Sequence, residues 1–288
     1  MNSSLSSNKV LYIDHPAVRR ERIEARAYQQ EIANKASQKN MLVVLPTALG
    51  KTIIAALVVA DFLYQHPKMR ILMMAPTRPL VLQHLDSFYR LLRVSREDMT
   101  VLTGVFAPEQ RRILWSGEAK LFFATPQTVK NDLEEGRVRL TDFSLLIFDE
   151  AHRATKDYAY GAIARRYMDD APWPTILGLT ASPGSSKERI EDVCSKLYIE
   201  QIEYRSEEHT DILPYVHPVE VQWIQVKLPE TYEELIDLAK KSLDEYLGWL
   251  REHGFPVGRT GYVSRRELLD LGDVLRERLR ELPEDMRG

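Results

Sequence analysis

The sequence is poor in three features that define large protein classes: cysteine, long apolar runs and an excess of positive charge. The single cysteine, Cys194, excludes an internal disulfide, and no cluster of cysteine and histidine suggests a structural zinc site. No apolar run is long enough to cross a bilayer, and the Ser- and Asn-rich start at 1–9 is unlike a secretory signal. We therefore expect a cytoplasmic protein with no membrane partner.

The net charge of -3 offers no overall attraction for a polyanion, so any contact with nucleic acid has to be local. Each arginine that could make such a contact is explained equally well by a solvated surface. These arginines are Arg19, Arg20, Arg22, Arg26, Arg78, Arg111 and Arg112. The 288 residues, 44% of them hydrophobic, are enough for one full domain with an appendage.

Short apolar runs recur along the first two thirds of the chain, and longer helical patterns separate most of them. The runs are 41–45, 71–75, 100–102, 121–124, 145–148 and 175–179, followed by a further short strand pattern at 199–204. Apolar strands that are continuous rather than alternating, interleaved with helices, predict an α/β fold whose parallel sheet is covered on both faces. Ligands of such sheets bind at the carboxyl ends of the strands.

A glycine-bearing loop, Pro46-Thr47-Ala48-Leu49-Gly50-Lys51-Thr52, follows the first of these runs and precedes the helical pattern 53–60. A tight turn before a helix points backbone N–H groups and the helix N-terminus at one spot, which favours anionic oxygens. We predict that Lys51 binds the β- and γ-phosphates of a nucleotide and that the Thr52 hydroxyl holds Mg²⁺. The general motif has glycine where this chain has Leu45, so support from a second motif is needed.

That second motif is Asp149-Glu150-Ala151-His152, at the end of the run 145–148. Two adjacent acids at the carboxyl edge of a strand can both face a nucleotide, one toward the metal and the other toward the attacking water. We assign Asp149 to Mg²⁺ and Glu150 to the water. A solvated acidic turn is the alternative, and the apolar strand directly before the pair argues against it.

Polar segments follow six successive strand runs. They are 47–52, 76–78, 103–104, 125–127, 149–152 and 180–182. An ordinary turn explains any one of them, because Thr, Pro, Gly and Ser are common turn residues. Together they predict that one edge of the sheet is a working surface.

The pattern changes in the last third of the chain. We expect a first domain at 1–205 and a connecting segment at 206–228 that contains a strand, in which Val219, Val221 and Trp223 alternate with polar residues. Helix start signals at Pro229 to Glu234 and at Ser264 to Glu267 open the region 229–288. Two amphipathic helices without a sheet need a surface to cover, so we expect a helical module that is incomplete at Gly288.

With these motifs in place, the chain resembles the first RecA-like domain of superfamily 2 helicases, and most of all the archaeal Hef and Fanconi-anaemia M-type branched-DNA translocases. The resemblance extends over about 13–204, and the remainder is similar to the start of that family's inserted helical domain. The motifs that carry it are Arg26-Ala27-Tyr28-Gln29 and the segments 46–52, 75–80, 102–104, 124–127, 131–133, 149–152 and 178–184.

The resemblance implies ATP and Mg²⁺ as cofactors and assigns a role to each motif. The residues expected to bind nucleotide are Arg26, Gln29, Pro46, Thr47, Ala48, Leu49, Gly50, Lys51 and Thr52, with Gln29 at the adenine edge. Lys51, Asp149 and Glu150 are the expected catalytic residues, and Thr52 and Asp149 the metal ligands. The expected contacts to the phosphates of branched or duplex DNA, without sequence preference, are Arg78, Thr103, Gly104, Thr125 and Gln127. His152, Thr180 and Ser182 are expected to couple hydrolysis to strand movement.

The chain departs from the family pattern in two places. Ala48 stands where the family usually has glycine, and its Cβ would disfavour a positive φ near the phosphates. A second RecA-like domain, which in the family supplies arginines to the transferring phosphoryl group, is expected in cis or in trans. The segment 258–261 superficially matches that arginine motif, but its surroundings favour a loop between helices.

Two further functions are compatible with the same residues. The chain could be a truncated module that binds nucleotide and nucleic acid with little turnover. The track could also be RNA, because contacts to phosphates distinguish the two sugars poorly.

Overall fold

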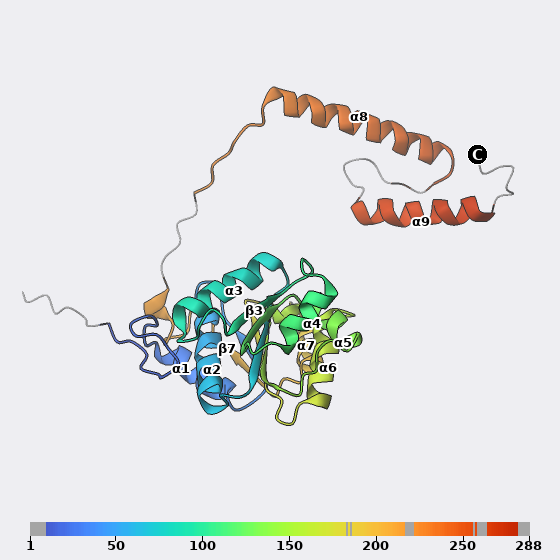
Figure 1. Cartoon of the computed structure of the whole chain (residues 1–288). Coiled ribbons are helices and arrows are strands. Elements are labelled where there is room, and N and C mark those ends of the chain that lie inside the picture. Colours follow the sequence, from blue (N-terminus) through green and yellow to red (C-terminus); the bar gives the residue numbers. More distant parts are fainter. Residues whose placement is uncertain are drawn as a thin grey trace, which may run out of the picture. The chain divides into compact units, whose positions relative to one another are not determined.

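The computed structural model describes residues 10–182, 184, 186–216, 222–255, 257 and 264–281. The chain divides into two compact units, Met1–Pro218 and Val219–Gly288. The first unit contains a seven-stranded sheet with helices packed around it (Figure 1). This arrangement confirms the predicted α/β fold class.

All neighbouring strands of the sheet are parallel, in the order β3-β4-β2-β5-β6-β1-β7. The strands are β1 (Met41–Val44), β2 (Arg70–Met74), β3 (Met99–Leu102), β4 (Leu121–Ala124), β5 (Phe143–Asp149), β6 (Ile176–Thr180) and β7 (Gln201–Tyr204). In this order β6 lies between β1 and β5. The loop after β1 and the acidic segment after β5 therefore flank the carboxyl end of β6.

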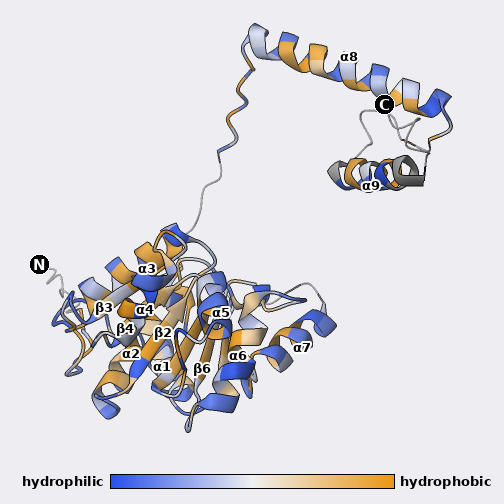
Figure 2. Ribbon diagram, turned by 45° about the vertical axis from the view of Figure 1, so that its right-hand side comes forward, coloured by the Kyte–Doolittle hydropathy of each residue, from blue (hydrophilic) through white to orange (hydrophobic). Residues whose placement is uncertain are grey.

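Helices cover both faces of the sheet. On one face lie α1 (Ala27–Ala36), α2 (Lys51–Gln65) and α3 (Arg78–Leu91), and on the other α4 (Pro108–Ser116), α5 (Pro126–Glu134), α6 (Ala159–Asp170) and α7 (Lys187–Lys196). Successive strand residues alternate between the two cores: Met41 and Val43 pack with α1 to α3, and Leu42 and Val44 with α4 to α7. Burial on both sides explains why interior strands such as β1 and β4 are continuously apolar (Figure 2).

The connecting segment contains a short 3₁₀ turn, η2 (Leu213–Tyr215). Its described residues, 206–216 and 222–228, include no strand, and Trp223 is 93% exposed. Val219 and Val221, the other apolar members of the predicted strand, lie outside the described residues. Alternation produces an apolar face, but a strand also needs a neighbour for its backbone hydrogen bonds, and the described part of this segment has none.

The second unit consists, in its described part, of α8 (Glu230–Glu252) and α9 (Arg265–Glu281). The predicted helix start before α9 is a reciprocal capping box: the Ser264 N–H donates to Glu267 Oε2 at 2.6 Å, and the Glu267 N–H donates to Ser264 Oγ at 3.2 Å. Leu247 is buried, whereas most other apolar side chains of α8 are exposed. The segment 258–261 lies outside the described residues. Within the described residues, no helix combines the length and apolar character needed to cross a membrane.

Candidate nucleotide site and nucleic-acid edge

The loop between β1 and α2 has two residues with left-handed backbone. Gly50, the residue before α2, has φ 86°, and a Cβ at this position would collide with the Gln29 side-chain amide. Both conditions favour glycine here. Ala48 has φ 69°, so its Cβ does not prevent the positive φ. The loop nevertheless bears a conformational cost of about 1–2 kcal/mol at that alanine.

The Lys51 ammonium lies over this loop. Its Nζ donates to the carbonyl of Leu45 at 2.8 Å and to that of Pro46 at 3.2 Å. Burial lowers the pKa of Lys51, and the negative charges of Glu150 and Asp149 act in the opposite direction. The structure thus brings Lys51 within electrostatic reach of two acids that lie about a hundred positions away in the sequence.

Asp149 is the last residue of β5, and it is buried. Its carbonyl accepts a 2.6 Å hydrogen bond from the Tyr160 hydroxyl, and its Oδ2 lies 2.8 Å from His84 Nε2. Glu150 follows in left-handed conformation, at φ 51° and ψ 47°, and leads into the 3₁₀ turn η1 (Ala151–Arg153). This change of direction ends the strand and places two successive acids at one edge of the sheet.

The three residues expected to couple hydrolysis to movement form one connected group with Glu150. His152 Nδ1 lies 3.2 Å from Glu150 Oε2 and 3.0 Å from Thr180 Oγ1. The Thr180 hydroxyl donates to the Ser182 carbonyl at 2.8 Å. Because β6 lies between β1 and β5, Thr180 at its end is the natural meeting point for the two nucleotide motifs.

The upstream element holds the phosphate loop. Tyr28 donates through its hydroxyl to the Leu49 carbonyl at 2.8 Å, and the buried Gln29 amide donates to the same carbonyl at 3.3 Å. The Arg26 guanidinium stacks on the Tyr215 ring, 4.5 Å from its centroid. In this structure Gln29 therefore supports the loop, in addition to the base-reading role expected for it.

The residues expected to bind nucleic acid differ in accessibility. Arg78, at the start of α3, is exposed, as are Gly104 and Gln127. Thr125, half-buried, shares a 2.8 Å hydroxyl contact with Thr128. The Thr103 side chain is buried, and Oγ1 has no hydrogen-bond partner among the described residues. Of the pair Thr103 and Gly104, therefore, Gly104 is the accessible residue, and the contact expected of Thr103 stays a prediction.

Arg111, one of the arginines considered for a local nucleic-acid contact, is also unsuited to it. The guanidinium is buried and donates to Asp132 from Nε at 2.8 Å and from Nη2 at 2.7 Å. Arg137 and Trp115 donate to the same carboxylate, each at 2.9 Å. Burial alone would raise the pKa of Asp132, but the hydrogen bonds from Arg111, Trp115 and Arg137 outweigh it and lower the pKa. We refer to these four residues as the Asp132 cluster.

Two contacts at the site were not foreseen from the sequence. His84 could have been noticed, because the spacing of Val81, His84, Leu85 and Phe88 places a polar ring on the buried face of a helix. Tyr215 carries no comparable signal, since it reaches Arg26 from a part of the chain almost two hundred residues away.

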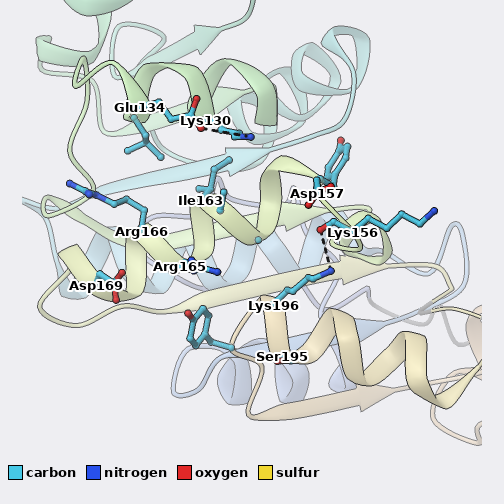
Figure 3. Close-up of a pocket in the computed structure, with 15 residues that line it drawn as sticks. Lys130, Glu134, Lys156, Asp157, Ile163, Arg165, Arg166, Asp169, Ser195 and Lys196 are labelled. Carbon is cyan, nitrogen blue, oxygen red and sulfur yellow. Dashed lines mark hydrogen bonds and ion pairs between the residues drawn. The ribbon is translucent and has the colours of Figure 1, made fainter. Parts of the chain in front are cut away.

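A surface groove of about 660 Å³ lies among α5, α6 and α7 (Figure 3). Charged residues such as Lys130, Arg165 and Lys196 line it, together with the apolar side chain of Ile163. None of the residues predicted for nucleotide or nucleic acid lines this groove. This groove therefore lies apart from the residues expected to bind phosphates.

The family model for the DEAD/DEAH box helicase matches residues 26–190. The chain is 38% identical over 265 residues to a putative ATP-dependent RNA helicase of Methanocaldococcus jannaschii, covering 92% of this chain and 33% of that protein. It is 39% identical over 248 residues to the DEAD-box ATP-dependent DNA helicase Fancm of Drosophila melanogaster, covering 85% of this chain and 17% of that protein. The crystal structure of the Pyrococcus furiosus Hef helicase domain is similar, with 44% identity, a TM-score of 0.68, and coverage of 94% of this chain and 58% of that one.

Proposed function

Because the chain belongs to the DEAD/DEAH box helicase family, on the branch of Hef and Fancm, we propose that it is the ATP-binding motor domain of a DNA helicase or translocase. The chain spans a third or less of the two relatives described above, so the partners of the whole protein are part of this proposal. We propose branched or duplex DNA as the track. Hydrolysis drives strand movement when a second RecA-like domain, in cis or in trans, completes the site.

The observation that supports this function best is the convergence of Lys51, Asp149 and Glu150 at one edge of the sheet. In the proposed reaction the Lys51 ammonium exchanges its loop carbonyls for the β- and γ-phosphate oxygens. The Glu150 carboxylate orients the attacking water and accepts its proton. The N-terminus of α2 adds backbone N–H groups directed at the phosphates.

The residues present fit Mg²⁺. Thr52 and Asp149 offer a hydroxyl and a carboxylate, the oxygen donors that this hard cation prefers. Asp149 Oδ1 accepts no hydrogen bond from any residue that the structure describes, so one carboxylate oxygen is available to a metal or to a water bound to it. A bound Mg²⁺ would neutralise charge on the phosphate oxygens.

The contacts from Glu150 through His152 to Thr180 suggest how hydrolysis reaches the track. A shift of Glu150 upon loss of the γ-phosphate would move the His152 ring, which also contacts the Thr180 hydroxyl. Thr180 in turn holds the Ser182 carbonyl at the end of β6. We propose that this group transmits the state of the nucleotide to the residues that bind DNA.

The decisive test measures Mg·ATP binding and DNA-stimulated phosphate release by the 288-residue chain and by Glu150→Gln. Glu150→Gln keeps the size of the side chain but removes the general base. We therefore expect Mg·ATP binding to persist and the rate of phosphate release to fall by at least about 100-fold. Glu118→Gln, a change at an exposed residue, serves as the matched control. A wild-type chain that fails to bind Mg·ATP would contradict the proposal, whereas binding without stimulated release, even with a second RecA-like domain supplied in trans, would favour the inert binding module.

RNA is the second candidate track, and the Methanocaldococcus jannaschii relative, which is named as an ATP-dependent RNA helicase, favours it. Paired titrations with DNA and RNA duplexes of one sequence discriminate between the two. Tighter binding of DNA, with stronger stimulation of phosphate release, supports the DNA motor. The opposite ranking supports the RNA alternative, because the 2′-hydroxyl is what distinguishes the two tracks.

A further inference from the structure

His84 makes a buried polar contact that the proposed mechanism does not use. It lies on the buried face of α3, and its Nε2 is 2.8 Å from Asp149 Oδ2. The His84 side chain is 9% exposed and that of Asp149 11%. An ionised carboxylate only accepts hydrogen bonds, so the ring donates from Nε2.

The surroundings of the other ring nitrogen, Nδ1, indicate that the contact with Asp149 explains why this position is a histidine. Nδ1 is buried and has no hydrogen-bond partner in the described part of the chain. Leaving a buried polar atom unpaired costs about 1–3 kcal/mol, a cost that an apolar side chain at this position would avoid. In the tautomer that carries its proton on Nε2, Nδ1 is an acceptor, and the ring has no buried N–H without a partner.

The contact restrains the carboxylate that we assign to the metal. The Tyr160 hydroxyl holds the Asp149 backbone carbonyl, and His84 holds Oδ2, which leaves Oδ1 available. Lys51 interacts electrostatically with the same carboxylate. Without His84, the carboxylate would be free to turn toward the ammonium, and that pairing would occupy two groups that the nucleotide and its metal both need.

We propose that His84 is a positioning residue for the metal site: it holds Asp149 in the orientation that binds Mg²⁺ and keeps it away from Lys51. This inference rests on the proposed function, because it presupposes a bound Mg²⁺-nucleotide. Partners that orient metal ligands in this way are worth about 10- to 100-fold in metal affinity. The effect of losing His84 should therefore be seen in the dependence on Mg²⁺ rather than in the fold.

The test titrates Mg²⁺ into the 288-residue chain with a fluorescent ADP analogue as the probe. His84→Leu removes the donor, and we expect the Mg²⁺ concentration at half-maximal binding to rise about 10- to 100-fold. Binding of the analogue in EDTA should stay unchanged. His84→Gln can place an amide N–H near the position of Nε2 and should restore most of the Mg²⁺ affinity. Leu85→Ala, a loss of buried volume on the same helix without a polar contact, should leave the Mg²⁺ dependence unaltered.

Thermal unfolding shows whether each variant is folded. As a second measurement that needs no variant, ¹⁵N NMR of the wild-type chain reports which nitrogen of the His84 ring carries the proton. A proton on Nε2 and a bare Nδ1 support the proposal; the opposite tautomer overturns it. An unchanged Mg²⁺ dependence in folded His84→Leu, or an equal loss of binding with and without metal, also overturns it. If the wild-type chain shows no Mg²⁺-dependent binding at all, the proposed function fails together with this inference.

Discussion

Two parts of the same sheet edge differ in how they hold their functional groups. The proposed nucleotide part is defined by Lys51, Asp149, Glu150 and Thr180. Lys51 interacts electrostatically with both acids, Asp149 contacts His84, and His152 contacts both Glu150 and Thr180. At the nucleic-acid part, defined by Arg78, Gly104, Thr125 and Gln127, three of the four residues are exposed. The Gln127 amide there donates to Asn131, its neighbour one turn along α5, at 2.7 Å.

Gln127, one of these four residues, lies on α5, and the same helix carries Asp132 of the buried Asp132 cluster. The Asp132 cluster joins α4, α5 and the loop after α5 through charged hydrogen bonds that lie below the surface. A small triphosphate can be surrounded by groups fixed before it binds, whereas a long backbone needs an open surface. In the first region the expected functional residues interact with one another, whereas in the second the buried charged contacts are made by other residues of α4, α5 and the loop after α5.

The largest expected effect comes from breaking the Asp132 cluster. Asp132→Ala leaves the Arg111 and Arg137 charges without their shared carboxylate, and the free energy of unfolding should fall by about 3–5 kcal/mol. Urea denaturation measures this change. Asp169→Ala, at an exposed aspartate, is the control and should leave the denaturation midpoint unmoved. A similar midpoint for both variants would mean that the Asp132 cluster is not what stabilises this region.

The same carboxylate should give the domain a dependence on acid. The folded-state pKa of Asp132 lies below its unfolded value, so the stability it contributes is complete above the unfolded pKa, about 4, and is lost as pH falls through the folded pKa. The difference in unfolding free energy between the wild type and Asp132→Asn should therefore shrink as the pH falls below about 4. Denaturation series at several pH values measure it, and a constant difference would contradict the assignment.

The next effect concerns the nucleotide part. Lys51→Ala removes the ammonium that we assign to two phosphates, and ATP affinity should fall by about 100-fold, since hydrogen bonds to charged groups are worth about 1.5–3 kcal/mol each. Nucleotide titration measures it. Lys68→Ala, at an exposed lysine just beyond the other end of α2, is the matched control. Equal affinities for the two variants would remove the basis for a nucleotide site here.

A smaller effect is expected at the nucleic-acid part, because its groups are solvated. Arg78→Ala should weaken DNA binding roughly two- to fivefold and reduce the slope of log affinity against log salt by about 1. Thr103→Val sharpens the comparison: the hydroxyl is buried, so binding should stay unchanged. Fluorescence anisotropy at several salt concentrations measures both. A stronger effect of Thr103→Val than of Arg78→Ala would reverse our view of this surface.

The smallest effect is expected at the strained loop. Ala48→Gly removes the conformational cost at φ 69°, partly offset by the greater freedom of glycine in the unfolded chain, so stability should rise by no more than about 1 kcal/mol. Thermal unfolding measures the gain. A loss of stability would show that the alanine methyl group makes a contact worth more than the strain.

Much of this architecture could be predicted because the signals are local. Each apolar run from 41–45 to 175–179 became a strand, and a segment buried on both faces has to be apolar throughout. The strand expected around Trp223 is absent from the described part of its segment, where pairing partners are missing. Local alternation therefore predicts a strand reliably only where a neighbouring strand is available.

The roles of individual site residues were harder to predict where they depend on burial or on partners that are distant in the sequence. Arg111 and Arg112 are adjacent in the sequence, yet the first is buried against Asp132 and the second is exposed beside Glu109. Thr103 belongs to a motif expected at the surface, but its side chain points into the protein. No local pattern distinguishes these cases, because the partners of a side chain come from other elements of the fold.

The sequence by itself determined the succession of strands and helices along the chain, the glycine-bearing loop after β1 and the acidic end of β5. Each of these depends on neighbouring residues and on hydrophobic periodicity. Only the tertiary structure decided that β6 lies between the two motifs expected to bind nucleotide, that His84 meets Asp149 across 65 positions, and that the Asp132 cluster joins α4 to α5. These contacts arise when parallel strands and their helices pack, and packing brings together residues that no short window of sequence contains.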